Sequence, residues 1–234
     1  MEALEQSRVT VVGLGGVGSW CAEALVRSGL GNISIVDSDQ IAETNINRQV
    51  QATNRTLGRP KTEALEERLK EINPNCNVKS FYSHFSKETA ALFVIPSTDY
   101  VIDAIDTIYC KLDLIESSLA AGKTLFSSMG MAKKLDPTLI KTADIWKSSG
   151  CPLARLVRQG LRKRGVFGNF TVVYSDELLP QRSGHIEKDN GKIINGSAVT
   201  VTATAGMVLA SLVIRDMYSR YAPQNDPNAE ESYG

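Results

Sequence analysis

The sequence predicts an α/β fold in which helices cover both faces of a mostly parallel sheet. Short β-branched runs alternate with stretches of helical periodicity between residues 8 and 135. The first strand, helix and strand together span about thirty residues, the length that a βαβ crossover requires. Such alternation predicts parallel strands with their ligands at the carboxyl ends.

The first βαβ unit begins with the β-branched run Arg8–Val12, which ends at Gly13. Apolar residues at helical spacing start after Gly18 and stop at the glycine-containing stretch 28–31. Asn32–Asp37 then supplies the second strand. The crossover between two such strands is right-handed, so we expect the two strands to be parallel neighbours.

The remaining elements follow in order along the chain. Up to residue 135 the sequence predicts helices over 61–72, 86–94 and 111–121, and strands over 78–82, 100–104 and 124–128. After Pro137 it predicts strands over 140–146 and 170–175, helices over 153–163 and 206–220, and an exposed loop over 184–196. We therefore expect one domain over 1–234, divided into a core (8–135), a C-terminal lobe that adds strands and a helix (136–222) and a disordered polar tail (223–234).

Charge and composition narrow the classes of function. The chain has 26 lysines and arginines and 26 aspartates and glutamates, so no overall field draws it to nucleic acid or membrane. Its four cysteines form no Cys-x-x-Cys pair, which argues against a local zinc site or a disulfide framework and favours a reducing, cytoplasmic location. The N-terminus has no apolar run of the secretory type. Polar residues interrupt the uncharged stretch 193–214, as in a strand followed by a buried helix, so we expect no stable membrane insertion.

A glycine-rich turn links the first predicted strand to the first helix. Gly13, Gly15 and Gly18 have the spacing of the Rossmann dinucleotide fingerprint, and Asp37 lies nineteen residues beyond Gly18, where an acid commonly binds ribose hydroxyls. By itself this pattern indicates NAD. Backbone N–H groups at a helix start, including that of Gly16, can approach the phosphates of ATP equally well, so other residues must decide.

Two cations and a carboxylate beyond the turn favour a triphosphate. Arg48 can bridge phosphates with its planar guanidinium, and Lys61 at a predicted helix start can place a point charge on them. Either one alone is more typical of a solvated loop charge, but the pair follows a nucleotide-binding turn. Asp106, at the end of an apolar strand, could hold Mg²⁺ against phosphate oxygens or could cap the next helix.

Together these motifs resemble the ATP-binding pattern of the ubiquitin-activating-enzyme-like superfamily, also called E1-like or ThiF-type. The matching motifs are Gly-x-Gly-Gly-x-Gly at 13–18, Asp-x-Asp at 37–39, Asn-x-x-Arg-Gln at 45–49, Pro-Lys at 60–61 and Asp-x-x-Asp at 103–106. The resemblance makes 8–135 the nucleotide-binding core and implies nucleotide contacts by Asp37, Asp39, Asn45, Arg48, Lys61 and, through magnesium, Asp106. It also implies catalytic roles for Arg48, Lys61 and Asp106 during attack of a carboxylate on the α-phosphate of ATP.

The second half of the chain resembles the tRNA threonylcarbamoyladenosine dehydratase branch of that superfamily. The matching stretches lie at 127–130, 135–138, 143–145, 152–155, 174–177 and 196–206. The resemblance implies an ATP- and Mg²⁺-dependent enzyme that adenylates the carboxylate of the threonylcarbamoyl group on a tRNA adenosine beside the anticodon and dehydrates it to a cyclic product. The carbamoyl part of the same side chain closes the ring, so no catalytic cysteine is required. A homodimer, and a sulfur-relay protein as a further partner, are also implied.

Three alternatives stay open. Sulfur-carrier activators of the same superfamily adenylate a C-terminal glycine, but they usually hold zinc with two Cys-x-x-Cys pairs, which this chain lacks. An NAD-dependent dehydrogenase accounts for the glycine turn alone. A scaffold that retains the fold without catalysis is the third.

A basic segment in the second half is the candidate tRNA contact. It comprises Arg155, Arg158, Arg162, Lys163 and Arg164, of which the first three fall on one face of a predicted helix. A phosphate backbone could lie along this face, although a solvated face is the commoner meaning of a charge run. Lys133 and Lys134 could extend the same surface. His84 is alone in its surroundings and has no partner that suggests general base catalysis. We interpret all four cysteines (Cys21, Cys76, Cys110 and Cys151) as buried structural residues.

Overall fold

The structure, a computed structural model, describes residues 2–90, 97–178, 188–189, 192–193 and 196–221 of the 234-residue chain. Its α-helices are α1 (Glu2–Gln6), α2 (Gly18–Arg27), α3 (Lys61–Ile72), α4 (Ile108–Ala120), α5 (Pro152–Lys163) and α6 (Val199–Tyr221). Its strands are β1 (Arg8–Val12), β2 (Asn32–Asp37), β3 (Asn77–Tyr82), β4 (Tyr100–Asp103), β5 (Thr124–Ser128), β6 (Ile140–Asp144), β7 (Thr171–Ser175), β8 (Lys188–Asp189) and β9 (Lys192–Ile193).

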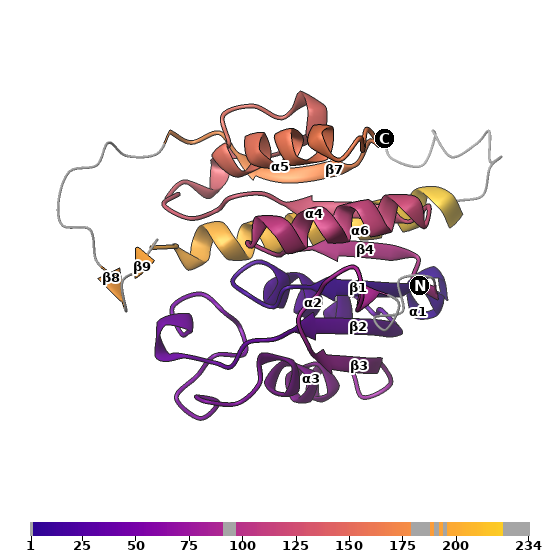
Figure 1. The fold of residues 1–234 in the computed structure, drawn as a ribbon. Helices are drawn as coiled ribbons and strands as arrows, with labels where there is room; N and C mark the ends of the chain where they lie inside the picture. The colour runs from indigo at the N-terminus through magenta and orange to yellow at the C-terminus, as the bar shows by residue number, and fades with distance from the viewer. Residues whose placement is uncertain (1, 91–96, 179–187, 190–191, 194–195, 222–234) are drawn as a thin grey trace, which may run out of the picture.

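Within these described residues, seven strands form one sheet in the order β3-β2-β1-β4-β5-β7-β6 (Figure 1). All neighbouring strands are parallel except β6, which runs antiparallel to β7. The chain builds β1, β2 and β3 outward and then returns to place β4 on the other side of β1. The mostly parallel sheet is confirmed. A ligand crevice belongs where the strand order reverses, between β1 and β4.

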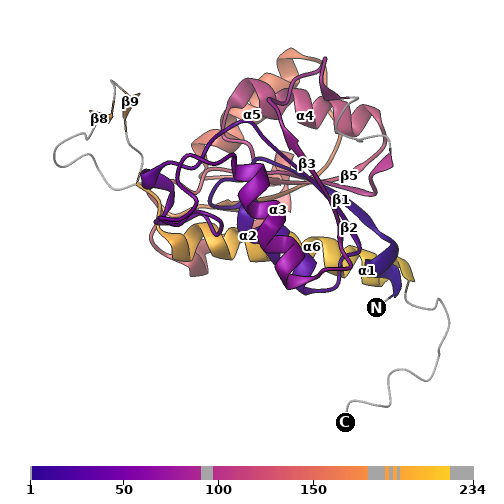
Figure 2. The ribbon, with the colours of Figure 1, turned by 90° about the horizontal axis from the view of Figure 1, so that it is seen from below.

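Helices cover both faces of the sheet, with α2, α3 and α6 on one side and α4 and α5 on the other (Figure 2). Side chains of the central strands alternate between the two faces. Val11 and Ile35 belong to the apolar cluster under α2 and α6, whereas Val12 and Val36 belong to the cluster under α4 and α5. All four side chains are buried, which is why these strands are apolar at nearly every position.

Two strands of the C-terminal part of the chain belong to the sheet of the core. Strands β6 and β7 extend it beyond β5, and α6 returns to pack beside α2. By length and composition alone, α6 could span a membrane, with a mean hydropathy of 1.4 over Val199–Arg220. In this fold its Val201, Leu209 and Val213 side chains are fully buried in the protein core, as in a central helix of a globular protein.

Two helices differ from the sequence prediction. α6 begins at Val199 rather than at residue 206, because burial of Val201 and Ala205 overrides the weak helix propensity of the threonines between them. The short helix α1 was not expected. Its end is held by Ser7 Oγ, which donates a hydrogen bond of 2.5 Å to the carbonyl of Ala3.

Two loops also differ. The helix expected over 86–94 is wrong for its described part, 86–90, where the backbone N–H of Ser86 and the hydroxyl of Thr89 form a 2.8 Å hydrogen bond that closes a turn. The strand expected to reach 146 ends at Asp144, whose side chain accepts a 2.8 Å hydrogen bond from the backbone N–H of Trp146.

Most of the expected loop at 184–196 and all of the tail at 223–234 lie outside the described residues. The described part of the loop contains β8 and β9, which pair as a short antiparallel hairpin. The other predicted helices and strands are confirmed, with ends that move by three residues or fewer.

Candidate nucleotide-binding site

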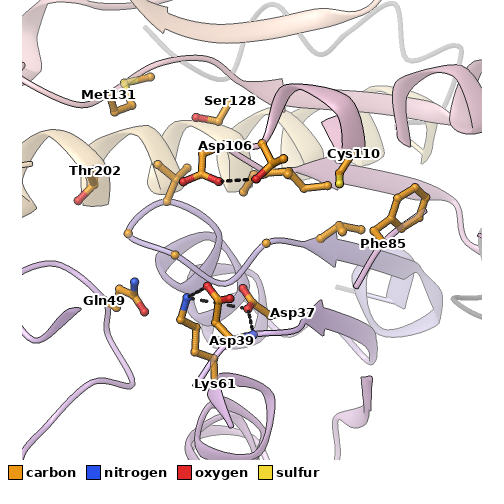
Figure 3. A pocket seen from close by; sticks show the side chains of 18 of the residues that line it. Asp37, Asp39, Gln49, Lys61, Phe85, Asp106, Cys110, Ser128, Met131 and Thr202 are labelled. Carbon is orange, nitrogen blue, oxygen red and sulfur yellow. Dashed lines mark hydrogen bonds and ion pairs between the residues drawn. The ribbon is translucent and has the colours of Figure 1, made fainter. Parts of the chain in front are cut away.

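A pocket of about 830 Å³ lies at the carboxyl ends of β1, β2, β4 and β5, where the strand order reverses (Figure 3). Its lining combines segments that are far apart in the sequence: the glycine turn, the region 36–49, Lys61, the segment 83–85, the stretch 104–110 and the stretch 128–132. Ser197 and Thr202 add a wall from the start of α6. The sequence prediction of a ligand site at this edge is therefore matched by a cavity.

The glycine turn needs its glycines for two physical reasons. Gly13 has a φ of +91°, and a Cβ there would lie 2.6 Å from the carbonyl oxygen of Ala104. A Cβ on Gly18 would lie 1.8 Å from the carbonyl oxygen of Gly13, so the turn can close this tightly only with glycine at position 18. Gly18 itself does not line the pocket. Gly15 does line the pocket, and a Cβ there would meet open space. Backbone N–H groups at the start of α2 thus remain accessible to an anion.

Asp37 joins the end of β2 to the glycine turn. One carboxylate oxygen accepts a 2.6 Å hydrogen bond from the N–H of Leu14, and the other accepts a 2.8 Å bond from the N–H of Asp39. Burial raises the pKa of this carboxyl above its ordinary value, and the charge of Lys61 and the two N–H groups only partly oppose that shift. Asp37 lines the pocket at the carboxyl end of β2.

Lys61 is buried at the first position of α3 with its ammonium at the pocket wall. The Nζ atom lies 2.7 Å from Oδ2 of Asp39 and 3.9 Å from Oδ1 of Asp37. The Asp39 side chain is 66% exposed, so its attraction for the ammonium is weakened by water. Figure 3 shows the three side chains gathered below the glycine turn.

Arg48 and Asn45 line the pocket from the loop after β2. Arg48 Nη1 donates hydrogen bonds to the carbonyl of Thr44 (2.7 Å) and to Oδ1 of Asn47 (2.8 Å). The side-chain oxygen of Asn45 accepts a 3.1 Å bond from the N–H of Ala42, which fixes the loop. These hydrogen bonds hold the guanidinium through neutral oxygens rather than through a carboxylate.

Gln49 is a pocket residue that sequence reasoning missed. Its side chain is buried, and its Oε1 atom has no hydrogen-bond partner among the residues that the structure describes. A buried polar atom without a partner is unfavourable unless a ligand or water satisfies it. The signal was present in the sequence, because Gln49 is the last member of the Asn-x-x-Arg-Gln motif.

Asp106 lines the pocket just after β4. Its carboxylate accepts a 3.4 Å hydrogen bond from the hydroxyl of Thr107, and Thr107 rather than Asp106 occupies the N-cap position of α4. The capping alternative for Asp106 is thus wrong. Within the described part of the chain no three His, Cys, Asp or Glu side chains group together, so a Mg²⁺ ion here would be held by Asp106 and by phosphate oxygens. A single carboxylate facing a phosphate site fits that role.

Asp103, the other acid of the same motif, has a different environment. It is fully buried, and its Oδ2 atom lies 2.7 Å from Nζ of Lys111 and 2.6 Å from Oγ of Ser127. Lys111 Nζ also donates a 3.0 Å bond to the carbonyl of Ser128. This network joins the ends of β4 and β5 under the pocket.

His84 is not isolated, contrary to its interpretation from the sequence. Its Nε2 atom lies 3.0 Å from Sγ of Cys110, and both residues line the pocket. Burial, followed by the charges of Asp113 and Asp106, raises the pKa of the Cys110 thiol. All four cysteines are buried and unbridged, as expected.

The basic residues of α5 divide into two groups. Arg155, Arg162 and Lys163 are exposed. Arg158 instead turns inward, to the carbonyl of Ile145 and the hydroxyl of Ser148, and Arg164 pairs with Asp113 at 2.6 Å and Glu116 at 3.1 Å. The expectation for Lys134 is wrong, because its ammonium is buried against the carbonyl of Glu177.

The fold and the pocket define an α/β protein of the nucleotide-binding type, with two cations and a carboxylate lining a pocket beside a glycine-rich turn. The chain belongs to the ThiF family, whose model matches residues 1–230. The family expected from the motifs is therefore confirmed.

Named relatives share nearly the whole chain. tRNA threonylcarbamoyladenosine dehydratase of Bacillus subtilis is 39% identical over 226 residues, which cover 93% of this chain and 89% of the relative. Solved structures of the E. coli dehydratase in complex with AMP and with ATP are similar, each at 34% identity and a TM-score of 0.86. These matches cover 94% and 96% of this chain and 89% and 90% of the relative. Molybdopterin-synthase adenylyltransferase of Escherichia coli is 30% identical over 85% of this chain and 82% of the relative.

Proposed function

We propose that this chain is an ATP-dependent tRNA-modifying enzyme that adenylates the carboxylate of threonylcarbamoyladenosine and dehydrates it to the cyclic form. The carrying observation is that one pocket brings Arg48, Lys61 and Asp106 together with the glycine turn, although they come from separate segments. Relatives named as dehydratases of this nucleoside, with AMP or ATP in their solved structures, support the same activity.

Each pocket residue has a role in binding ATP. Asp37 accepts hydrogen bonds from the ribose hydroxyls. The N–H groups of Gly15 and Gly16 donate hydrogen bonds to the phosphate oxygens. Asn45 and Arg48 contact the phosphates from the loop after β2. Lys61 reaches them from α3, once its bond to the exposed Asp39 is exchanged for a phosphate oxygen.

The reaction has two steps. The threonylcarbamoyl carboxylate attacks the α-phosphorus of ATP, and pyrophosphate leaves. The carbamoyl group then attacks the carbonyl carbon of the mixed anhydride and loses a proton, AMP leaves, and the ring closes with net loss of one water. Arg48 and Lys61 stabilise the charge that develops on the phosphates. Asp106, which lines the pocket, would hold Mg²⁺, and the bound ion would neutralise further phosphate charge.

The test is the mass of the modified nucleoside in tRNA after incubation with the protein, ATP and Mg²⁺. We expect loss of one water from threonylcarbamoyladenosine, with Arg48→Lys and Asp106→Asn each slowing it by about a hundredfold. Arg55→Lys, in an exposed loop outside the pocket, and Glu71→Gln, at the exposed end of α3, are the matched controls. Undiminished water loss in both site variants would show that the pocket residues are assigned wrongly.

The second candidate function is activation of a sulfur-carrier or ubiquitin-like protein at its C-terminal glycine. The similarity to molybdopterin-synthase adenylyltransferase favours it. Pyrophosphate exchange that is stimulated by such a protein, and not by tRNA, would establish this alternative. The NAD-dependent dehydrogenase suggested by the glycine turn gains no support from ATP- and AMP-bound relatives. Tight binding of NADH without binding of ATP would support the dehydrogenase alternative.

The proposal also includes partners, location and organisation. The exposed Arg155, Arg162 and Lys163 contact tRNA, with Arg158 and Arg164 anchoring α5 behind them. We further propose a homodimer, a sulfur-relay partner, a cytoplasmic location and a single domain over 1–234. Sedimentation of the purified protein tests the dimer directly, and limited proteolysis tests the single domain.

A further inference from the structure

An exposed aromatic stack lies just beyond the end of α5. Phe167 is 67% exposed and stacks on Trp146, with ring centroids 6.3 Å apart and planes inclined by 28°. The guanidinium carbon of Arg162 lies 5.3 Å from the centroid of the Trp146 ring. We call Phe167, Trp146 and Arg162 the stacking surface.

The stacking surface is fixed in place. Trp146 Nε1 donates a 3.2 Å hydrogen bond to the carbonyl of Gly168, and its indole packs against the apolar cluster under α5. Gly165 adopts a φ of +71°, and a Cβ on Gly168 would lie 2.9 Å from the side chain of Leu119. The two glycines thus set the path of the chain on either side of Phe167. One face of its ring rests on Trp146, and the residue as a whole remains mostly open to solvent.

The segment that carries Arg162 and Phe167 is basic. Residues 152–168 contain no acidic residue, and the exposed Arg155, Arg162 and Lys163 lie on the same helix. A single exposed phenylalanine is common on protein surfaces. An exposed aromatic face with cations beside it is a combination by which proteins bind single-stranded nucleic acid. A second exposed aromatic ring, Tyr109, lies 5.3 Å from the guanidinium carbon of Arg164.

The same helix connects the stacking surface to the nucleotide pocket. Leu153, in the first turn of α5, lines the pocket. Lys163, ten residues later, is about 15 Å away along the helix axis. Tyr109 directly precedes Cys110, which also lines the pocket. Phe167 itself precedes β7 and so lies toward the amino ends of the strands, away from the pocket. A tRNA loop whose reacting nucleoside enters the pocket therefore needs more than one nucleotide to reach this surface, and an unpaired loop of several nucleotides can span the distance.

We propose that the stacking surface binds an unpaired nucleobase of the tRNA loop that carries the reacting adenosine. The base stacks on the exposed face of Phe167, and Arg162 and Lys163 contact the adjoining phosphates. This inference rests on the proposed function in one respect, that tRNA is the substrate. The inference assigns a tRNA contact outside the pocket and leaves the proposed reaction with ATP unchanged.

The test is direct binding of an anticodon stem-loop that carries 2-aminopurine, a fluorescent adenine analogue, at each unpaired position in turn. Stacking on an aromatic ring quenches this base. We expect quenching at one position with the parent protein and not with Phe167→Leu, which stays apolar but has no ring. Phe167→Leu should also weaken binding by about tenfold, and Phe167→Tyr should restore it. Tyr218→Leu is the control, because Tyr218 is an exposed aromatic residue of α6, the helix that covers the opposite face of the sheet (Figure 2).

A second readout separates stacking from charge. The salt dependence of binding should be unchanged in Phe167→Leu and shallower in Lys163→Gln, because only the second removes a phosphate contact. Parent-like binding by Phe167→Leu overturns the inference, and so does equal weakening by Phe167→Leu and Tyr218→Leu. If Phe167 binds a protein partner instead of tRNA, Phe167→Leu should bind the stem-loop as tightly as the parent does. If the parent itself neither binds nor dehydrates tRNA, the proposed function fails rather than the stacking surface alone.

Discussion

The ammonium of Lys111 lies 2.7 Å from the carboxylate of Asp103, and neither side chain has any exposed surface. Ser127 Oγ donates a 2.6 Å hydrogen bond to the same carboxylate oxygen, and Lys111 also binds the carbonyl of Ser128. The pair lies below the pocket floor that Asp106 and Ser128 help to form. It therefore couples the stability of the core to the shape of the nucleotide site.

Removal of one partner from this buried pair should be strongly destabilising. We expect Lys111→Met to lower the free energy of unfolding by about 3–5 kcal/mol, because the Asp103 charge is left buried without a counter-ion. Denaturation in urea measures the loss. The double variant Lys111→Met/Asp103→Asn should lose less than the sum of the two single variants. Strict additivity would show that the two groups do not depend on each other.

ATP affinity should depend on pH through Asp37. Burial raises the pKa of Asp37 above its ordinary value of 3.8, so the ionised form that accepts ribose hydroxyls is reached only at higher pH. The KM for ATP should fall as pH rises through that raised pKa, and the dependence should be absent in Asp37→Asn. Because the folded pKa exceeds the unfolded one, the contribution of Asp37 to stability is greatest below pH 3.8 and declines as pH rises through the folded pKa. A profile for Asp37→Asn that matches the parent would assign the titration to another group.

Cys110 should be the cysteine that reports on occupancy of the pocket. Among the four cysteines, it is the one that lines the pocket, beside His84. Its raised pKa keeps the thiol mostly protonated, so alkylation by iodoacetamide should be slow at neutral pH and faster at higher pH. Mass spectrometry should show labelling at Cys110 that ATP suppresses.

Turnover by a Cys110→Ala variant should stay within a factor of about two of the parent rate, because the nucleophile belongs to the substrate. A variant that folds normally but has no turnover would instead indicate a covalent role for the thiol.

Gly206 should tolerate no larger side chain. A Cβ at this position would lie 2.6 Å from the carbonyl oxygen of Val17 and 2.9 Å from Cβ of Trp20, so α6 would have to move away from α2. Alanine gains about 1 kcal/mol of helix propensity over glycine, but overpacking typically costs about 1–3 kcal/mol. We expect Gly206→Ala to lower the melting temperature by several degrees.

The same substitution should raise the KM for ATP, because Val17 belongs to the glycine turn. The control is Gly122→Ala, at a helix end where a Cβ would meet open space but φ is +64°. It is expected to affect stability alone.

The alternation of strands and helices and the glycine turn were predictable because local periodicity and turn residues determine them. Asp106 could be placed at the pocket because the carboxyl ends of parallel strands converge. Lys61 could be placed there because it starts a predicted helix beyond the glycine turn and matches a family motif. The contact between His84 and Cys110 could not be foreseen, since it joins a loop to a helix 26 residues away. The burial of Lys134 likewise depends on a carbonyl of a distant segment.

The packing of α6 against the glycine turn has a consequence for how the protein is made. Thr202 forms part of the pocket wall, and Gly206 contacts the turn itself, although both belong to the last helix of the described chain. Strands β1 to β5 emerge from the ribosome first, but the cavity they border lacks one wall until α6 arrives. The nascent chain can therefore complete its nucleotide pocket only after α6 has emerged.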